Sequence, residues 1–198
     1  MVQVSLKTLV AKLDPLVHGA LEQAAWLCRS NTHYDVELEH LMLKLLEEDD
    51  SDITRILRHF EVDGSRLVSD VTAALAGFRR GSRETPGISA RIETLFREAW
   101  IHASLSEDLG RVRSGNVLLA LLSDHELHQL ADRMSREFRR IDTDELEAHF
   151  SALVAGSPEE RSAPAGGGAA QASGGGPSGS GLPAPTGTTA LDQFTIDL

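Results

Sequence analysis

Apolar residues recur along most of the chain at the spacing of amphipathic helices. In SLKTLVAKL, residues 5–13, they fall at i, i+3, i+4 and i+7 and form one stripe, made of Leu6, Leu9, Val10 and Leu13. The same spacing predicts helices over the following ranges: about 15–30, 38–47, 52–60, and one that begins after Asp63. Asp14 followed by Pro15 is typical of a helix start, because the carboxylate caps free N–H groups and proline fits the first turn. Sustained alternation typical of strands is absent from the sequence, so we expect an all-α fold.

The order of these patterns recurs in the second half of the sequence. Three pairs of segments match: ALEQAAW at 20–26 with TLFREAW at 94–100, LMLKLL at 41–46 with VLLALL at 117–122, and VDGSRL at 62–67 with IDTDEL at 141–146. The offsets of 74, 76 and 79 residues drift slowly, as expected when loops lengthen between equivalent helices. The sequence therefore predicts a tandem pseudo-twofold repeat of a four-helix unit, over about 14–78 and 89–154. The helix at 5–13 is an extra element outside both repeats.

The composition changes near Gly156. From residue 162 to 190, all but two residues are Ala, Gly, Pro, Ser or Thr. Such a segment cannot bury enough apolar surface to offset the entropy lost on ordering. We therefore expect one domain over 1–155, a flexible linker over 156–190, and the truncated start of a further module at 191–198, LDQFTIDL.

Charge and cysteine content limit the partners and the compartment. The formal net charge of -11 argues against a nucleic-acid partner, because phosphate contacts require a basic face. The single cysteine, Cys28, cannot form an internal disulfide, which favours a reducing cytoplasm. No apolar run is long enough to cross a membrane, and MVQVSLKTLV does not have the form of a signal peptide. We expect a cytoplasmic location and no membrane partner.

The stretch HYDVELEHLMLKLLEED, residues 33–49, combines histidines and carboxylates, as a metal or acid–base site would. In the second repeat the corresponding residues differ: Arg113, Gly115 and Asn116 replace Glu37, Glu39 and His40. This difference excludes a metal site common to both halves and leaves open one confined to the first half. Glu39 and His40 project about 100° apart on a helix, and the H-E-x-x-H spacing is absent. Acidic residues at a helix start complement its dipole. We interpret His40 as a structural residue that turns inward and fixes the start of its helix, and we predict no metal site.

Signatures of catalysis are absent from the sequence. There is no G-x-x-x-x-G-K-[ST] phosphate loop and no G-x-S-x-G elbow, so we expect neither a catalytic residue nor a bound cofactor in this chain. Cys28, on the apolar side of a helix, is interpreted as a small core residue. Trp26 and Trp100 occupy equivalent positions in the two repeats and are predicted to be structural packing anchors.

The duplicated unit, with EHLMLKLL in its first half and NVLLALL in its second, resembles the N-terminal domain of Clp/Hsp100 AAA+ unfoldases. Two longer segments are similar to the ClpV (TssH) branch, the ATPases of type VI secretion: LVAKLDPLVHGALEQAAWLC at 9–28 and YDVELEHLMLKLLEEDDSDITRIL at 34–57. An extra first helix is a feature of that branch. The final LDQFTIDL resembles the approach to the first AAA+ module. The resemblance covers residues 5 to about 155 and the last eight.

The resemblance implies a non-catalytic domain of a hexameric motor that disassembles contracted secretion sheaths for reuse. ATP and magnesium would bind only in AAA+ modules beyond this chain. The N-terminal domain would capture a short helix of the sheath protein TssC (VipB), which contraction exposes. The isolated domain is expected to be monomeric, and an accessory secretion protein is a second partner that the resemblance admits.

The stripe on the first helix is a candidate for the binding surface. A helix of about ten residues is marginal alone, so the stripe must pack on something. It either covers the core or forms one wall of a groove that takes an apolar helix face. By analogy with the family, the other wall lies near TPGISARIE, residues 85–93. There Ile88 and Ile92 are the apolar candidates and Arg91 is a polar residue at the rim.

Two main candidate functions therefore remain, and a third is an alternative. The first is capture of the sheath protein by a ClpV-type unfoldase. The second is a general Clp-type docking domain for adaptors or substrates, in proteolysis or disaggregation. The third is an independent hydrolase or metal enzyme.

Overall fold

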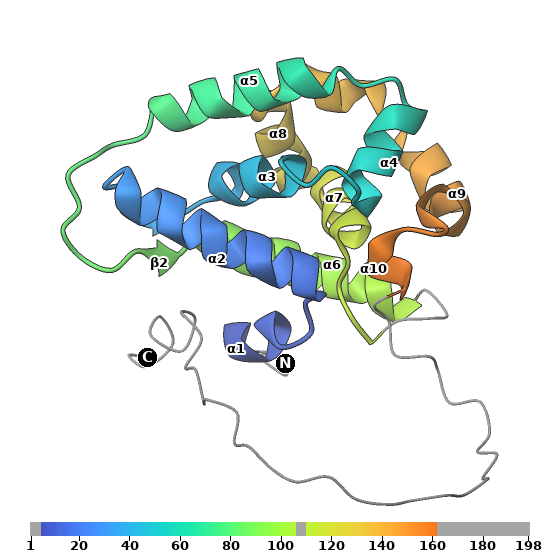
Figure 1. The fold of residues 1–198 in the computed structure, drawn as a ribbon, viewed down its shortest axis with the longest axis horizontal. Helices are drawn as coiled ribbons and strands as arrows, with labels where there is room; N and C mark the ends of the chain where they lie inside the picture. The colour runs from blue at the N-terminus through green and yellow to red at the C-terminus, as the bar shows by residue number, and fades with distance from the viewer. Residues whose placement is uncertain (1–4, 106–109, 162–198) are drawn as a thin grey trace, which may run out of the picture.

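The chain folds as a succession of helices, as the apolar spacing predicts. The computed structural model describes residues 5–105 and 110–161 (Figure 1). Within these ranges the elements follow in this order: α1 (Leu6–Val10), α2 (Pro15–Ser30), β1 (Asp35–Val36), α3 (Leu38–Leu46), α4 (Asp52–His59), α5 (Gly64–Ala76), β2 (Gly87–Ile88), α6 (Ala90–Leu105), α7 (Ser114–Ser123), α8 (His125–Met134), the 3-10 helix η1 (Arg136–Arg140), α9 (Thr143–Val154) and α10 (Pro158–Arg161). The expected all-α class is confirmed.

Local capping explains where these helices begin. The Asp14 carboxylate accepts the Leu16 N–H at 3.0 Å and starts α2, and Asp63 caps α5 in the same way. The bounds of α2 to α4 agree with the expected ranges to within one residue. Helix α1 is shorter than expected, because the chain leaves it after Val10 and Leu13 forms a parallel bridge with Val112.

The expectation that strands are absent is wrong in one detail. Strands β1 and β2, two residues each, pair in parallel, with Asp35 opposite Gly87 and Val36 opposite Ile88. Each strand directly precedes a helix, α3 or α6, so the pairing brings the starts of these helices together. Two residues are too few to produce an alternating pattern that could be read from the sequence.

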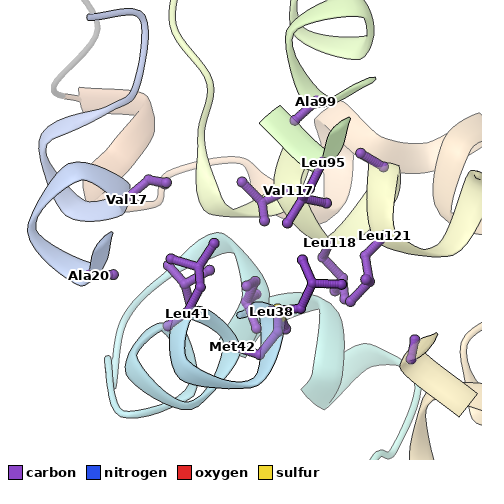
Figure 2. Close-up of a cluster of buried hydrophobic side chains, with 14 of the residues drawn as sticks. Val17, Ala20, Leu38, Leu41, Met42, Leu95, Ala99, Val117, Leu118 and Leu121 are labelled. Carbon is purple, nitrogen blue, oxygen red and sulfur yellow. The ribbon is translucent and has the colours of Figure 1, made fainter. Parts of the chain in front are cut away.

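The two halves of the chain share one hydrophobic core. Helices α2 to α5 carry the first set of matching segments and α6 to α9 the second, and the halves interlock, with α4 packed on α7 and α9 and α5 on α8. Figure 2 shows Leu41 and Met42 of α3 facing Val117 and Leu118 of α7, with Leu95 of α6 close by. These side chains are buried where the two halves meet, so neither half forms a core by itself.

The structured part of the chain extends beyond residue 155, which corrects the predicted start of the linker at 156. Gly156 adopts a positive φ of 72°, a conformation that glycine takes without strain, and the chain turns there into α10. Ser157 and Glu159 are buried, and Glu159 accepts hydrogen bonds from residues of α4 and α7. A four-residue helix with two glutamates gives no apolar signal in the sequence, because polar contacts hold it in place. The remainder of the predicted linker, 162–190, and the segment 191–198 lie outside the described residues.

Candidate functional site

Helix α1 presents one apolar face to the domain and leaves part of it at the surface. The Ser5 hydroxyl caps its first turn by accepting the Thr8 N–H at 3.3 Å. Leu9 is only 2% exposed and Leu13 is buried as well, whereas Leu6 and Val10 are half-buried. Because five helical residues are not stable alone, Leu9 and Leu13 hold α1 on the domain, and Leu6 and Val10 offer apolar surface beside them.

The surface beneath α1 belongs to the second half of the domain. Helix α1 packs against α6, and the ammonium group of Lys12 lies 5.2 Å from the centroid of the Trp100 ring. The Val112 N–H donates to the Lys12 carbonyl oxygen at 2.7 Å, and the Asp14 N–H donates to the Val112 carbonyl oxygen at 2.8 Å. Both ends of the turn after α1 are thus fixed to the segment that leads into α7.

The residues expected on the second wall have three different environments. Ile88, in β2, is half-buried and Arg91 is exposed, whereas Ile92 is fully buried in the core. A guanidinium nitrogen of Arg91 lies 3.4 Å from a carboxylate oxygen of Glu37, the residue just before α3. This ion pair is largely exposed and contributes little stability, but it shows that Arg91 points toward α3.

The structure brings the α1 residues together and does not bring Arg91 to them. Nine positions separate Arg91 from Trp100, and at about 100° per residue their side chains leave α6 on opposite sides. Ile88 precedes α6, and the helix rises about 15 Å from its first residue to Trp100. The α1 surface and the Ile88–Arg91 surface are therefore two sides of α6, separated by the buried face that includes Ile92.

The two tryptophans differ, and the predicted packing role of Trp26 is wrong. Trp26 is 73% exposed, whereas Trp100 is partly buried against the core and lies under Lys12. Trp26 lies about 180° around α2 from the buried Val17, which places it on the outer face. The repeat duplicates the tryptophan, but only the second copy lies under Lys12, in the turn after the extra helix.

Exposed apolar side chains on α6 were not anticipated from the sequence. Ile101 and Leu105 are 44% and 78% exposed and lie four residues apart, on one side of the helix. Their i, i+4 spacing was the only signal in the sequence, and it is the same signal that buried residues give.

The histidines of residues 33–49 form a buried structural pair. The Glu37 N–H donates to His40 Nδ1 at 3.1 Å, and His40 Nε2 lies 2.8 Å from His33 Nδ1. His40 Nδ1 accepts a hydrogen bond, so the ring proton of His40 is on its Nε2 and is donated to His33 Nδ1. The ring proton of His33 is then on its own Nε2. Burial and the neighbouring His33 lower the pKa of His40 to about 4, and burial, together with Arg80, lowers the pKa of His33. The first turn of α3 is therefore fixed by a neutral imidazole.

The second repeat builds the same helix start with an amide. The Arg113 N–H donates to Asn116 Oδ1 at 3.0 Å, so Asn116 does for α7 what His40 does for α3. Neither residue needs a metal for this role. Among residues 5–105 and 110–161 we find no cluster of three His, Cys, Asp or Glu side chains placed to hold a metal ion. Burial raises the pKa of the Cys28 thiol to about 11, which keeps it protonated and unreactive at neutral pH.

A mainly helical domain made from a doubled four-helix unit, with an added first helix, defines the class of this protein. Residues 12–134 match the family model of the Clp repeat (R) N-terminal domain, and the chain belongs to this family. Within the described residues, no helix combines the length and apolar character that crossing a bilayer requires.

The chain is similar to the AAA+ ATPase ClpV1 of Pseudomonas aeruginosa, with 32% identity over 199 residues that cover all of this chain and 22% of the relative. It is also 32% identical to the chaperone protein ClpB of Yersinia enterocolitica, over 81% of this chain and 18% of that protein. The chain thus spans about a fifth of the length of these relatives. A solved complex of the ClpV N-domain with a VipB peptide aligns with a TM-score of 0.70 and 31% identity, covering 80% of this chain and 97% of that one.

Proposed function

We propose that this chain is the substrate-capture domain of a type VI secretion unfoldase and binds an amphipathic helix of the sheath protein TssC (VipB). The observation that carries the proposal is α1, which lies outside the duplicated unit and keeps Leu6 and Val10 half-buried beside the buried Leu9. Similarity to a ClpV N-domain that was solved with a VipB peptide supports this choice of partner. As a Clp N-terminal domain the chain is non-catalytic, and ATP-driven sheath disassembly would belong to the full-length protein.

In this proposal the apolar face of the sheath helix packs on Leu6 and Val10. Leu9 and Leu13 are buried without a ligand and support this surface from below, and Ile92 is part of the core. Ile88 and Arg91 serve as a separate contact on the other side of α6. A peptide must be long enough to cross α6 if it is to reach both sides.

A general docking role for disaggregation is the second candidate. The similarity to ClpB favours it, because that relative is a chaperone with the same share of identical residues. The two functions differ in specificity: a sheath-capture domain discriminates one helix from unfolded chains, and a general docking domain does not.

Fluorescence anisotropy with a labelled VipB peptide tests the proposal, with unfolded casein as the competing substrate. We expect Val10→Arg and Leu6→Arg to weaken peptide binding by about tenfold or more, because each replaces an apolar contact with a charge. Trp26→Arg is the matched control, since it places the same charge on an exposed apolar site away from α1. Ile88→Arg tests the second contact separately.

Unchanged peptide affinity in both α1 variants would place the binding surface elsewhere. Equal binding of casein and the VipB peptide, with the same response to the variants, would favour the general docking role.

A further inference from the structure

A buried carboxylate joins the C-terminal helix of the described chain to both repeats. Glu159, on α10, is 1% exposed, and one of its oxygens accepts the Ser114 N–H at 2.6 Å. Its other oxygen accepts the Asp52 N–H at 2.8 Å and the Ser114 hydroxyl at 2.5 Å. Asp52 begins α4 and Ser114 begins α7, one helix in each half of the chain (Figure 1). One side chain therefore satisfies free N–H groups at the starts of two helices.

Arg113 completes this contact from the second half. One guanidinium nitrogen lies 2.7 Å from a carboxylate oxygen of Asp52 and 2.9 Å from the Ser157 hydroxyl, which caps α10 by accepting the Glu160 N–H. Arg113 and Asp52 are both buried, so the pair is shielded from solvent. Loss of either Arg113 or Asp52 would leave the other as a buried charge without its partner.

The same segment also carries α1. Val112, which directly precedes Arg113, exchanges backbone hydrogen bonds with Lys12 and Asp14 at 2.7 and 2.8 Å. Residues 112–114 therefore hold α1 through Val112 and α10 through Arg113 and Ser114. These three consecutive residues connect two short helices that are far apart in the sequence.

We propose that α10 is a clasp, by which we mean a helix whose docking on α4 and α7 fixes residues 112–114. Through these residues the docked α10 stabilises the position of α1 on the domain. Neither helix is long enough to persist without its contacts, so each depends on the position of this segment. Release of α10 loosens Val112 and the turn after α1. A ligand that requires α1 in place therefore favours the docked clasp, and by thermodynamic reciprocity the docked clasp favours that ligand.

Amide hydrogen exchange on the full chain tests the coupling without any ligand. Glu159→Ala removes all contacts of the carboxylate, and Ser157→Ala is a milder change that removes only the hydroxyl contacts of Arg113 and α10. Glu147→Ala is the matched control, because it removes an exposed carboxylate from the neighbouring α9. We expect exchange at Val112 and Asp14 to accelerate about tenfold or more in Glu159→Ala, less in Ser157→Ala, and not in the control.

Unchanged protection at Val112 and Asp14, with protection lost only at the partners Ser114 and Asp52, would overturn the proposal. If Glu159→Ala lowers protection throughout the core, Ser157→Ala decides: faster exchange at Val112 and Asp14 with the core intact supports the clasp, and slow exchange there contradicts it.

A second measurement rests on the proposed function and uses the VipB peptide. We expect Glu159→Ala to weaken peptide binding several-fold, and the bound peptide to slow exchange at Glu160 and Arg161 in the wild-type chain. If the wild-type chain does not bind the peptide, the proposed function fails, and the exchange experiment without ligand still decides the clasp. If the peptide binds but Glu159→Ala leaves its affinity unchanged, the clasp does not regulate the α1 surface.

Discussion

The buried pair of His33 and His40 sets a specific protonation requirement on the folded domain. Both rings act within one chain of hydrogen bonds that begins at the Glu37 N–H, and each ring can be neutral there with a single proton. His33 Nε2, which carries the last proton of the chain, has no partner among the described residues. A second proton on either ring would add a buried charge, so acid should disfavour the folded state.

The folded domain should lose stability through His40 as the pH falls. His40 has a folded pKa near 4 against about 6.5 in an unfolded chain, so the unfolded state binds the proton first as pH falls. Stability is therefore fully present above pH 6.5 and is lost progressively toward pH 4, by about 2 kcal/mol between pH 7 and 5. His40→Asn should remove this loss, because an amide caps the same position in α7 and does not titrate. Urea unfolding of both chains at the two pH values measures the difference.

The comparison between the two chains is essential, because Glu159 acts in the opposite direction. Burial and the nearby Asp52 raise the pKa of Glu159 to about 7, so acid favours the folded state through this group. The wild-type chain reports the sum, and the difference from His40→Asn isolates the imidazole. An equal acid sensitivity in both chains would show that His40 does not titrate as stated.

Two glycines in helices should respond oppositely to alanine. A Cβ on Gly115 would lie 3.0 Å from both the Asp52 Cβ and the Phe150 ring, whereas a Cβ on Gly19 has no neighbour within 4 Å. We expect Gly115→Ala to destabilise the domain by about 1–3 kcal/mol through overpacking. Gly19→Ala should stabilise it by about 0.5–1 kcal/mol through helix propensity. Chemical denaturation gives both values, and shifts of the same sign would contradict the packing argument.

At the scale of elements, the apolar face of α1 has two parts: a buried part that attaches the helix to the domain, and a part at the surface that can contact a ligand. Leu9 faces α6 and holds the helix, and Val10 lies at the edge of the same surface. Variants at neighbouring positions can therefore separate attachment from ligand contact.

We predict that Leu9→Arg detaches α1 and leaves the eight-helix core folded. A buried arginine without a partner is costly, and α1 has too few residues to stay helical once it is released. Exchange protection at Asp14 and Val112 should fall, with a small loss in the melting temperature. Val10→Arg should keep this protection and lose only peptide affinity. Global unfolding by Leu9→Arg would mean that α1 is an integral part of the core.

At the scale of the whole molecule, the two repeats form a single cooperative unit. Their apolar faces meet in one cluster, in which α3 of the first half packs close to α7 of the second (Figure 2). Each half alone would expose this face to water, which is why duplication yields one domain and not two independent ones.

A core truncation in one repeat should therefore destabilise both. Leu41→Ala removes a fully buried side chain and should cost about 3 kcal/mol. Native-state hydrogen exchange should show the same loss for the most protected amides of α3 and α7. Leu105→Ala, at a largely exposed position, is the control and should change neither. A loss confined to α2 to α5 would show that the halves unfold separately.

The sequence by itself determined the helices and the duplication. Caps such as Asp14 and Asp63 and the 3.6-residue apolar period act between near neighbours, so α2 to α4 and the start of α5 could be located to within a residue or two. The resemblance in residues 9–57 pointed to the family that the comparisons then showed. The inward turn of His40 was also readable, because it depends on a residue only three positions away.

Only the tertiary structure decided which apolar residues are covered and where the domain ends. Trp26 and Trp100 occupy equivalent positions in matching segments, yet Trp26 is 73% exposed, whereas Trp100 packs against the core and lies under Lys12. Helix α10 is held by Glu159 through bonds to residues 45 and 107 positions away, in a segment whose composition indicates a linker. Separations of this size lie beyond any local pattern, because the energy of such contacts depends on the arrangement of the whole chain and not on the residues beside them.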